Sequence, residues 1–143
     1  MDPNHSTIVA VVVLALSFFA CHRDTREARN LLDQATSFDE DYKPDAERKL
    51  LIEVITRYGN TVEGTEAKQR LTALNETVSN WYKTGLSGFR SDCGRAPTEK
   101  EGLKALIDNP GLKCWGGPYL PDIFAPIKPD YNALTGEITG TKR

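Results

Sequence analysis

The segment VEGTEAKQRLTALNETVSNWYK, residues 62–83, determines the fold class of this chain of 143 residues. Its apolar side chains recur every three or four positions, which is the spacing of one face of an α-helix. The pattern therefore predicts one long amphipathic helix, which needs other elements to cover its apolar face. The apolar positions are Ala67, Leu71, Leu74, Val78, Trp81 and Tyr82.

Two shorter helices are predicted before this segment. Residues 24–38 and 46–58 each carry apolar side chains at helical spacing. The acidic stretch between them ends in Pro44, which disfavours helix at the residue before it. Gly59 and Asn60 tolerate positive φ and are expected to end the second helix.

The composition changes after residue 84, where glycine and proline become frequent. Gly85 and Gly88 are taken as the start of a loop. Thr98 and Glu101 have the spacing of a capping box, in which each side chain satisfies a free backbone N–H, so a short helix is expected to follow and to end at residues 109–111. Residues 131–134 and 137–139 are predicted to form an antiparallel hairpin.

The N-terminal residues predict export. Residues 8–20, IVAVVVLALSFFA, carry no charge. A membrane-spanning helix needs about 20 apolar residues, whereas about 7–15 suit the apolar part of a signal peptide. We therefore predict a signal peptide at residues 1–20, although its first seven residues contain no Lys or Arg.

The sequence Ser17-Phe18-Phe19-Ala20-Cys21 resembles the bacterial lipoprotein box, in which a small residue precedes a cysteine that is diacylated and becomes the mature N-terminus. The resemblance implies that Cys21 is lipidated and tethers the chain to a membrane, facing the periplasm. We expect the outer membrane rather than the inner. Phe18 and Phe19 depart from the family preference for Leu and a small residue, so an ordinary secreted protein and a short signal anchor remain alternatives.

The chain has three cysteines, and an odd number in an exported protein needs an explanation. If Cys21 carries lipid, Cys93 and Cys114 remain to form a disulfide in an oxidising compartment. A zinc site needs about four protein ligands, or three when catalytic, and the mature chain has only His22 besides these two thiols. This ligand count favours a disulfide over a metal site.

Residues 46–74 resemble a tetratricopeptide helix pair. Tyr58 stands where an aromatic residue closes the first helix, and Ala67 and Leu71 have the spacing of the second. Such repeats usually need at least three copies to bury a continuous core. The resemblance implies a helical region at residues 21–60, and the alternative is a hairpin packed on the rest of the domain.

Three ordered blocks follow: CGRAPT at residues 93–98, EKEGLKAL at 99–106 and WGGPYL at 115–120. In this order they resemble the globular part of the major pseudopilin of type II secretion systems. The resemblance implies a pseudopilin-like region at residues 61–143. The family's N-terminal processing site with its long apolar helix and its C-terminal calcium loop are both absent, so neither filament assembly nor calcium binding is inferred.

No chemistry-bearing motif stands out in the mature chain. A net charge of −2 without a basic stripe gives no case for nucleic acid. There is no phosphate loop or dinucleotide motif, and His22 lies beside the predicted anchor. We therefore predict no catalytic residue, no metal, no cofactor and no small-molecule substrate.

The predicted fold class is α+β and mainly helical: N-terminal helical hairpin, long helix, disulfide-stapled loop, short helix and small antiparallel sheet. We expect a non-enzymatic, membrane-tethered envelope lipoprotein that acts through protein contacts, associated with a type II secretion or pilus-like system. Trp115, Tyr119 and Leu120 are the candidate partner surface. The alternative is a tetratricopeptide-like adaptor lipoprotein of the periplasm that binds its partner in a groove between helices.

Overall fold

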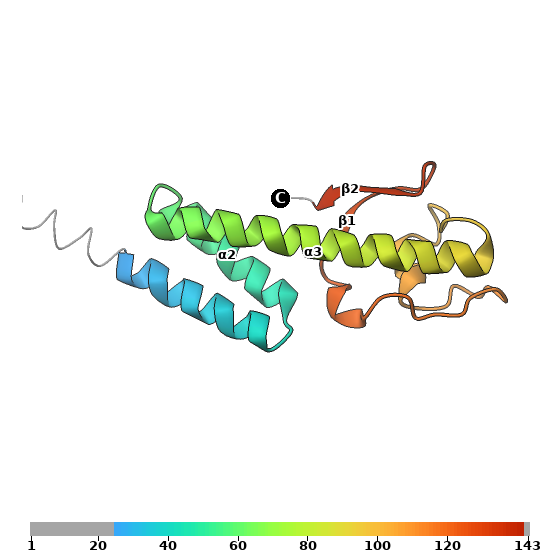
Figure 1. Cartoon of the computed structure of the whole chain (residues 1–143), viewed down its shortest axis with the longest axis horizontal. Coiled ribbons are helices and arrows are strands. Elements are labelled where there is room, and N and C mark those ends of the chain that lie inside the picture. The colour runs from blue at the N-terminus through green and yellow to red at the C-terminus, as the bar shows by residue number, and fades with distance from the viewer. Residues whose placement is uncertain (1–24, 142–143) are drawn as a thin grey trace, which may run out of the picture.

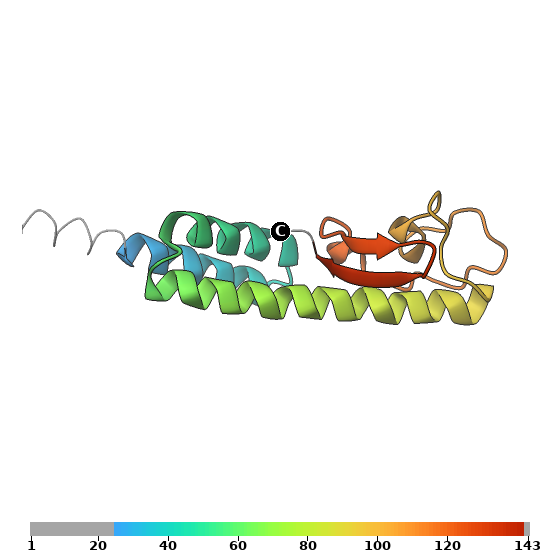
Figure 2. The same cartoon turned by 90° about the horizontal axis from the view of Figure 1, so that it is seen from above.

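The long helix predicted at residues 62–83 is the central element of the molecule. The computed structural model describes residues 25–141. Helix α3 (Val62–Cys93) runs along most of this elongated molecule (Figure 1), and the other elements lie along one side of it (Figure 2). The predicted signal peptide and Cys21 lie outside the described residues. No helix within residues 25–141 is long and apolar enough to cross a membrane.

Helix α3 is longer than the periodicity indicated, because it continues through Gly85 and Gly88 to Cys93. The prediction that these two glycines start a loop was wrong. They serve close packing instead: a Cβ at Gly88 would lie 2.9 Å from Cδ1 of Tyr119, and one at Gly85 would lie 3.1 Å from the Tyr119 carbonyl oxygen. The helix ends at Gly94, which has a left-handed φ of +67° and donates to the Arg90 carbonyl.

Residues 25–40 form a helix, called here the N-terminal helix, and α2 (Pro44–Tyr58) follows it after a short turn. Figures 1 and 2 show both helices lying against the first half of α3. The predicted break before Pro44 is confirmed. Gly59, however, has a φ of −58°, so positive φ is not what ends α2. The chain turns instead at Thr61, whose Oγ1 accepts a hydrogen bond from the Gly64 N–H at 3.1 Å and caps α3.

The three helices bury a small apolar core of their own. It consists of Ala28, Leu32, Ala35, Leu51, Val54, Tyr58 and Ala67. Leu71 and Leu74 of α3 pack against its edge. The predicted boundary between residues 60 and 61 falls in the turn between α2 and α3.

The remaining segments fold against the second half of α3. They are two 3₁₀ helices, η1 (Leu103–Leu106) and η2 (Asp122–Phe124), and an antiparallel hairpin of β1 (Pro129–Asn132) and β2 (Glu137–Thr141). The hairpin prediction is confirmed, with β1 starting earlier and β2 ending later than expected. Both hydrogen bonds of the capping box form, with the Thr98 N–H 2.7 Å from Glu101 Oε2. Yet the element that follows is one 3₁₀ turn, because Gly102 has a φ of +58° and interrupts the helix at its start.

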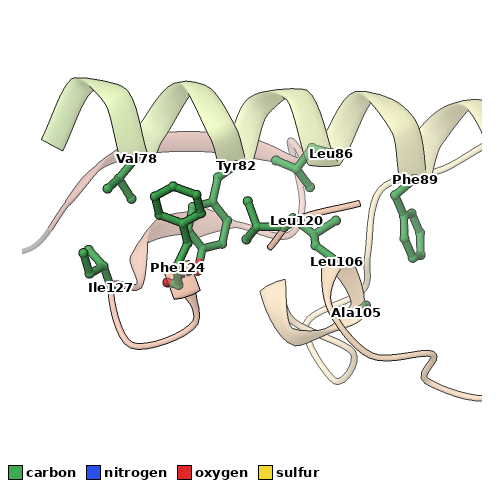
Figure 3. Close-up of a cluster of buried hydrophobic side chains, with 9 residues drawn as sticks. All are labelled: Val78, Tyr82, Leu86, Phe89, Ala105, Leu106, Leu120, Phe124 and Ile127. Carbon is green, nitrogen blue, oxygen red and sulfur yellow. Dashed lines mark hydrogen bonds between the residues drawn. The ribbon is translucent and has the colours of Figure 1, made fainter. Parts of the chain in front are cut away.

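A second core joins these segments to α3 (Figure 3). Leu74 packs against both cores, so the two halves of the molecule are continuous through α3. The fold is thus the predicted mainly helical α+β arrangement. The second core consists of Val78, Tyr82, Leu86, Phe89, Ala105, Leu106, Leu120, Phe124 and Ile127.

Candidate protein-interaction site

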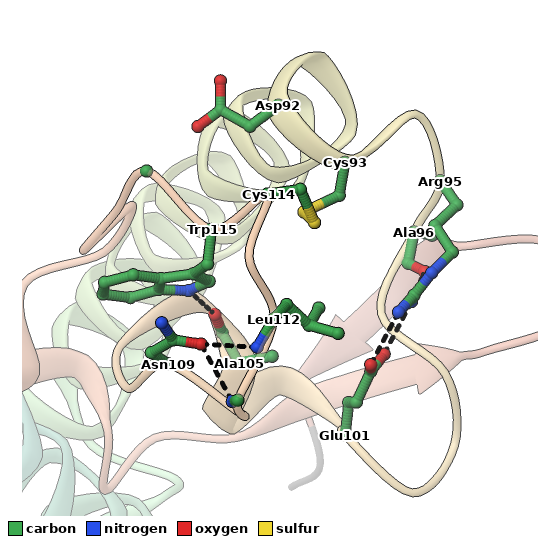
Figure 4. Close-up of a disulfide and its surroundings, with 12 residues drawn as sticks. Asp92, Cys93, Arg95, Ala96, Glu101, Ala105, Asn109, Leu112, Cys114 and Trp115 are labelled. Carbon is green, nitrogen blue, oxygen red and sulfur yellow. Dashed lines mark hydrogen bonds and ion pairs between the residues drawn. A yellow bond between two sulfur atoms is a disulfide. The ribbon is translucent and has the colours of Figure 1, made fainter.

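The candidate site lies at the end of the molecule where α3 stops. Cys93 is the last residue of α3 and forms a disulfide with Cys114, 21 positions later (Figure 4). The predicted pairing is confirmed. It attaches the loop of residues 94–113 to the helix end. Among residues 25–141, no three His, Cys, Asp or Glu side chains group to hold a metal ion.

Trp115, next to the disulfide, is half-buried, and a hydrogen bond from its indole N–H holds it in place. Its Nε1 donates to the Ala105 carbonyl oxygen at 2.7 Å (Figure 4). Its ring meets Tyr119 edge-on, with centroids 5.7 Å apart. Trp115 therefore fixes the loop to η1 and exposes only part of its ring.

Tyr119 crosses α3 at Gly88 and closes the loop from the other side. Its hydroxyl donates to Asp92 Oδ2 and accepts from the Gly116 N–H, both at 2.7 Å. Burial, reinforced by the Asp92 carboxylate, raises the pKa of Tyr119 above its usual value. The ring also packs edge-on against Phe89, with centroids 5.7 Å apart.

Leu120 does not belong to the surface on which it was predicted. It is only 2% exposed and lies in the second core. The N–H groups of Tyr119 and Leu120 both donate to the Leu106 carbonyl oxygen, which turns the Leu120 side chain inward. Of the three predicted partner residues, Trp115 and Tyr119 retain exposed surface.

Two residues of α3 that the sequence did not single out hold this end together. Asp92 binds the Tyr119 hydroxyl, and Arg90 donates to the Gly136 carbonyl oxygen at 2.5 Å, which ties the hairpin turn to the helix. Each contact joins residues more than 25 positions apart, and no local sequence pattern reports such a pairing.

A cleft of about 380 Å³ opens on the pseudopilin-like half, away from the disulfide. Its floor is Tyr82, whose hydroxyl donates to the Phe124 carbonyl oxygen at 3.1 Å. Burial raises the pKa of Tyr82 to about 12. The other lining residues come from η1 and its flanks and from the segment after η2: Gly102, Leu103, Lys104, Ile107, Asp108, Ala125 and Lys128.

Residues 58–135 match the family described as type II secretion system (T2SS), protein G. The match covers more than half of the 143 residues. The chain belongs to this family. The matched region contains α3, the disulfide-closed loop, both 3₁₀ helices and β1, so the predicted resemblance to a type II secretion pseudopilin is confirmed for residues 58–135.

Membership of the protein G family supports a role in type II secretion and a position facing the periplasm. The N-terminal helix and nearly all of α2 precede the matched residues. No curated protein matches the chain. No solved structure matches it either.

Proposed function

We propose that this chain is a membrane-tethered component of a type II secretion system, anchored through lipid on Cys21 and acting through protein contacts without catalysis. The observation that carries the proposal is the separation of the two ends of the molecule. The described part of the N-terminal helix starts at residue 25, beside the start of α3, and the disulfide lies at the far end of α3 (Figure 1).

The distance between these ends follows from helix geometry. The 32 residues of α3 span about 48 Å at about 1.5 Å per residue. Cys21 lies four residues before residue 25 in the sequence. A lipid on Cys21 would thus tether the helical end and hold the disulfide end away from the membrane, toward partners.

The packing of the helical end also supports a tethered unit rather than a filament subunit built on α3. Ala67 on α3 is fully buried beneath the N-terminal helix and α2, and Leu71 packs at the edge of the same core. This face of α3 is therefore not available to pack against other copies of the chain.

The disulfide end is suited to protein contact because its exposed residues sit on a fixed frame. Lys113 and Pro118 are exposed on either side of Trp115, and the loop between them is held by the disulfide and by the Tyr119–Asp92 hydrogen bond. A preorganised loop loses little conformational entropy on binding.

The anchor is tested by intact-mass and membrane-fraction analysis of the wild-type chain and the Cys21→Ser variant, expressed with their signal. We expect a lipid mass on the wild type, and we expect Cys21→Ser to leave the membrane fraction. A Cys93→Ser/Cys114→Ser chain is the control, because it removes the other cysteines and should keep the lipid. A wild-type chain without added lipid mass would refute the anchor.

The partner is tested with a photo-cross-linking residue placed at single exposed positions in cells that carry the secretion system. Lys113 and Pro118 probe the disulfide end, while Asn30 and Lys49 probe the helical end. We expect cross-links to secretion proteins from Lys113 and Pro118. If no position gives such a cross-link, action through protein contacts is refuted.

A tetratricopeptide-like adaptor is the second candidate, and one observation favours it. The first turn of α3 packs tightly against the end of α2 at Gly64, where any Cβ would clash with the Tyr58 carbonyl oxygen, so the two helices pack closely as a pair. For this function, cross-links are expected from Asn30 and Lys49 and not from the disulfide end.

A further inference from the structure

The cleft on the pseudopilin-like half has an apolar interior with a charged rim. Leu103, Ile107, Ala125 and Tyr82 supply its apolar lining. Its volume of about 380 Å³ lies near the small end of the range of roughly 300–1,000 Å³ that ligand sites occupy. A cleft of this size accommodates one apolar side chain and part of its backbone.

Two lysines line this cleft. Lys104 belongs to η1, and Lys128 lies between η2 and β1. Their backbone positions are fixed, since Ala105 is 1% exposed and Ile127 is 3% exposed. Both lysine side chains therefore extend from fixed backbone positions beside the cleft and remain in solvent.

The charge at the rim is not balanced within residues 25–141. Lys104 has only a 3.5 Å ion pair with Asp108, and both side chains are more than half exposed, at 81% and 62%. Such exposed pairs are weak and exchange readily. Lys128 forms no ion pair with the described part of the chain. Asp108 also lines the cleft, so its three charged residues, Lys104, Lys128 and Asp108, carry a net charge of +1.

We infer that the cleft receives an apolar side chain of a protein partner, and that Lys128 and Lys104 pair with an acidic residue adjacent to it. The inference rests on the proposed function in taking the occupant to be a protein segment. A polar side chain is disfavoured, because the apolar walls would remove its water without replacing the hydrogen bonds. A basic neighbour is disfavoured by repulsion from Lys128.

The inference is tested by ¹⁵N–¹H NMR titration of the disulfide-intact chain with short probes. The probes are N-acetyl-leucyl-aspartyl amide, N-acetyl-leucyl-lysyl amide, N-acetyl-seryl-aspartyl amide and decanoate. We expect the leucyl-aspartyl probe to give saturable shifts at Tyr82, Leu103 and Lys128 in the millimolar range. The other two peptides should bind at least about fivefold more weakly, because each lacks one of the two complementary features.

The Lys128→Glu variant tests the charge at an exposed position. It should weaken leucyl-aspartyl binding about fivefold and improve leucyl-lysyl binding. Lys113→Glu carries the same change in net charge outside the cleft and should leave both affinities unaltered. An unchanged spectrum outside the cleft verifies that each variant is folded.

Equal shifts from all three peptides, no saturation, or the same response from both glutamate variants would overturn the inference. Stronger binding of decanoate than of any peptide, at the same residues, would overturn it in favour of a fatty acyl ligand. The titration contains no secretion protein, so its failure removes the cleft as a docking site and leaves the proposed function to the cross-linking experiment.

Discussion

Arg70 joins all three helices of the N-terminal half, and its removal should destabilise the molecule substantially. From α3, its guanidinium donates to the Leu32 carbonyl oxygen at 3.2 Å, to Thr36 Oγ1 at 2.9 Å and to Glu47 Oε1 at 2.9 Å. The Glu47 side chain is only 6% exposed, whereas that of Arg70 is 23% exposed. The carboxylate thus depends on Arg70 much more than Arg70 depends on the carboxylate.

The expected magnitude follows from this asymmetry. Removing one partner of a buried ion pair costs about 3–5 kcal/mol, and the partial exposure of Arg70 places the Arg70→Met variant near about 3 kcal/mol. Glu47→Gln should cost less, about 1–2 kcal/mol, because Arg70 keeps two acceptors and access to water. The double variant Arg70→Met/Glu47→Gln should be more stable than Arg70→Met alone, because it leaves no buried charge unpaired.

Urea unfolding of the four chains, followed by circular dichroism, measures these free energies as a double-mutant cycle. We expect a coupling of more than about 1 kcal/mol between Arg70 and Glu47. Additive effects of the two substitutions would refute the argument that an uncompensated carboxylate causes the loss.

The pH dependence provides a separate check on the same pair. Burial raises the pKa of Glu47 above its usual value of 4.5, and the hydrogen bond from Arg70 opposes that rise. A carboxyl whose pKa is raised in the folded state binds protons more tightly there, so its ionisation at higher pH costs stability. The deficit of Arg70→Met should therefore be larger at pH 7 than at pH 4, and an equal deficit at both would contradict this reasoning.

Three further outcomes are expected. The Cys93→Ser/Cys114→Ser chain should lose about 3 kcal/mol of unfolding free energy, because without the disulfide the unfolded chain is no longer constrained between two residues 21 positions apart. An unchanged urea midpoint would contradict this expectation. The hydrogen bond from Arg95 lowers the pKa of Glu101 to about 2, so the stability from this carboxylate is complete above about pH 4.5 and lost as the pH falls toward 2. Glu101→Gln should remove that acid-dependent part of the wild-type curve, and parallel curves for the two chains would exclude it. Leu74→Ala should cost about 2 kcal/mol and should make the two cores unfold less cooperatively, seen as hydrogen-exchange protection lost in one half before the other.

The elements predicted correctly are those encoded over a few neighbouring residues. The apolar spacing along residues 62–83 is sufficient to predict a long helix, and the Thr98–Glu101 spacing is sufficient to predict their reciprocal hydrogen bonds. The disulfide between Cys93 and Cys114 follows from a count of cysteines in an exported chain. None of these predictions depends on contacts between residues far apart in the sequence.

The predictions were wrong at residues whose position is set by contacts with residues far away in the sequence. Gly85 and Gly88 have the composition of a loop, yet they lie within α3 because the Tyr119 segment crosses the helix there. Leu120 follows a turn and was expected on the surface, but two hydrogen bonds to the Leu106 carbonyl direct it inward.

The sequence by itself determined the helical periodicity, the hairpin and the blocks that link residues 58–135 to the type II secretion protein G family. These features depend on the spacing of residues close together in the sequence, so they can be predicted without the structure. Only the tertiary structure decided where α3 ends, which residues remain exposed beside the disulfide, and that Lys104 and Lys128 line the same largely apolar cleft. Such features depend on contacts between residues far apart in the chain, and packing energy selects among arrangements that local sequence leaves equally available.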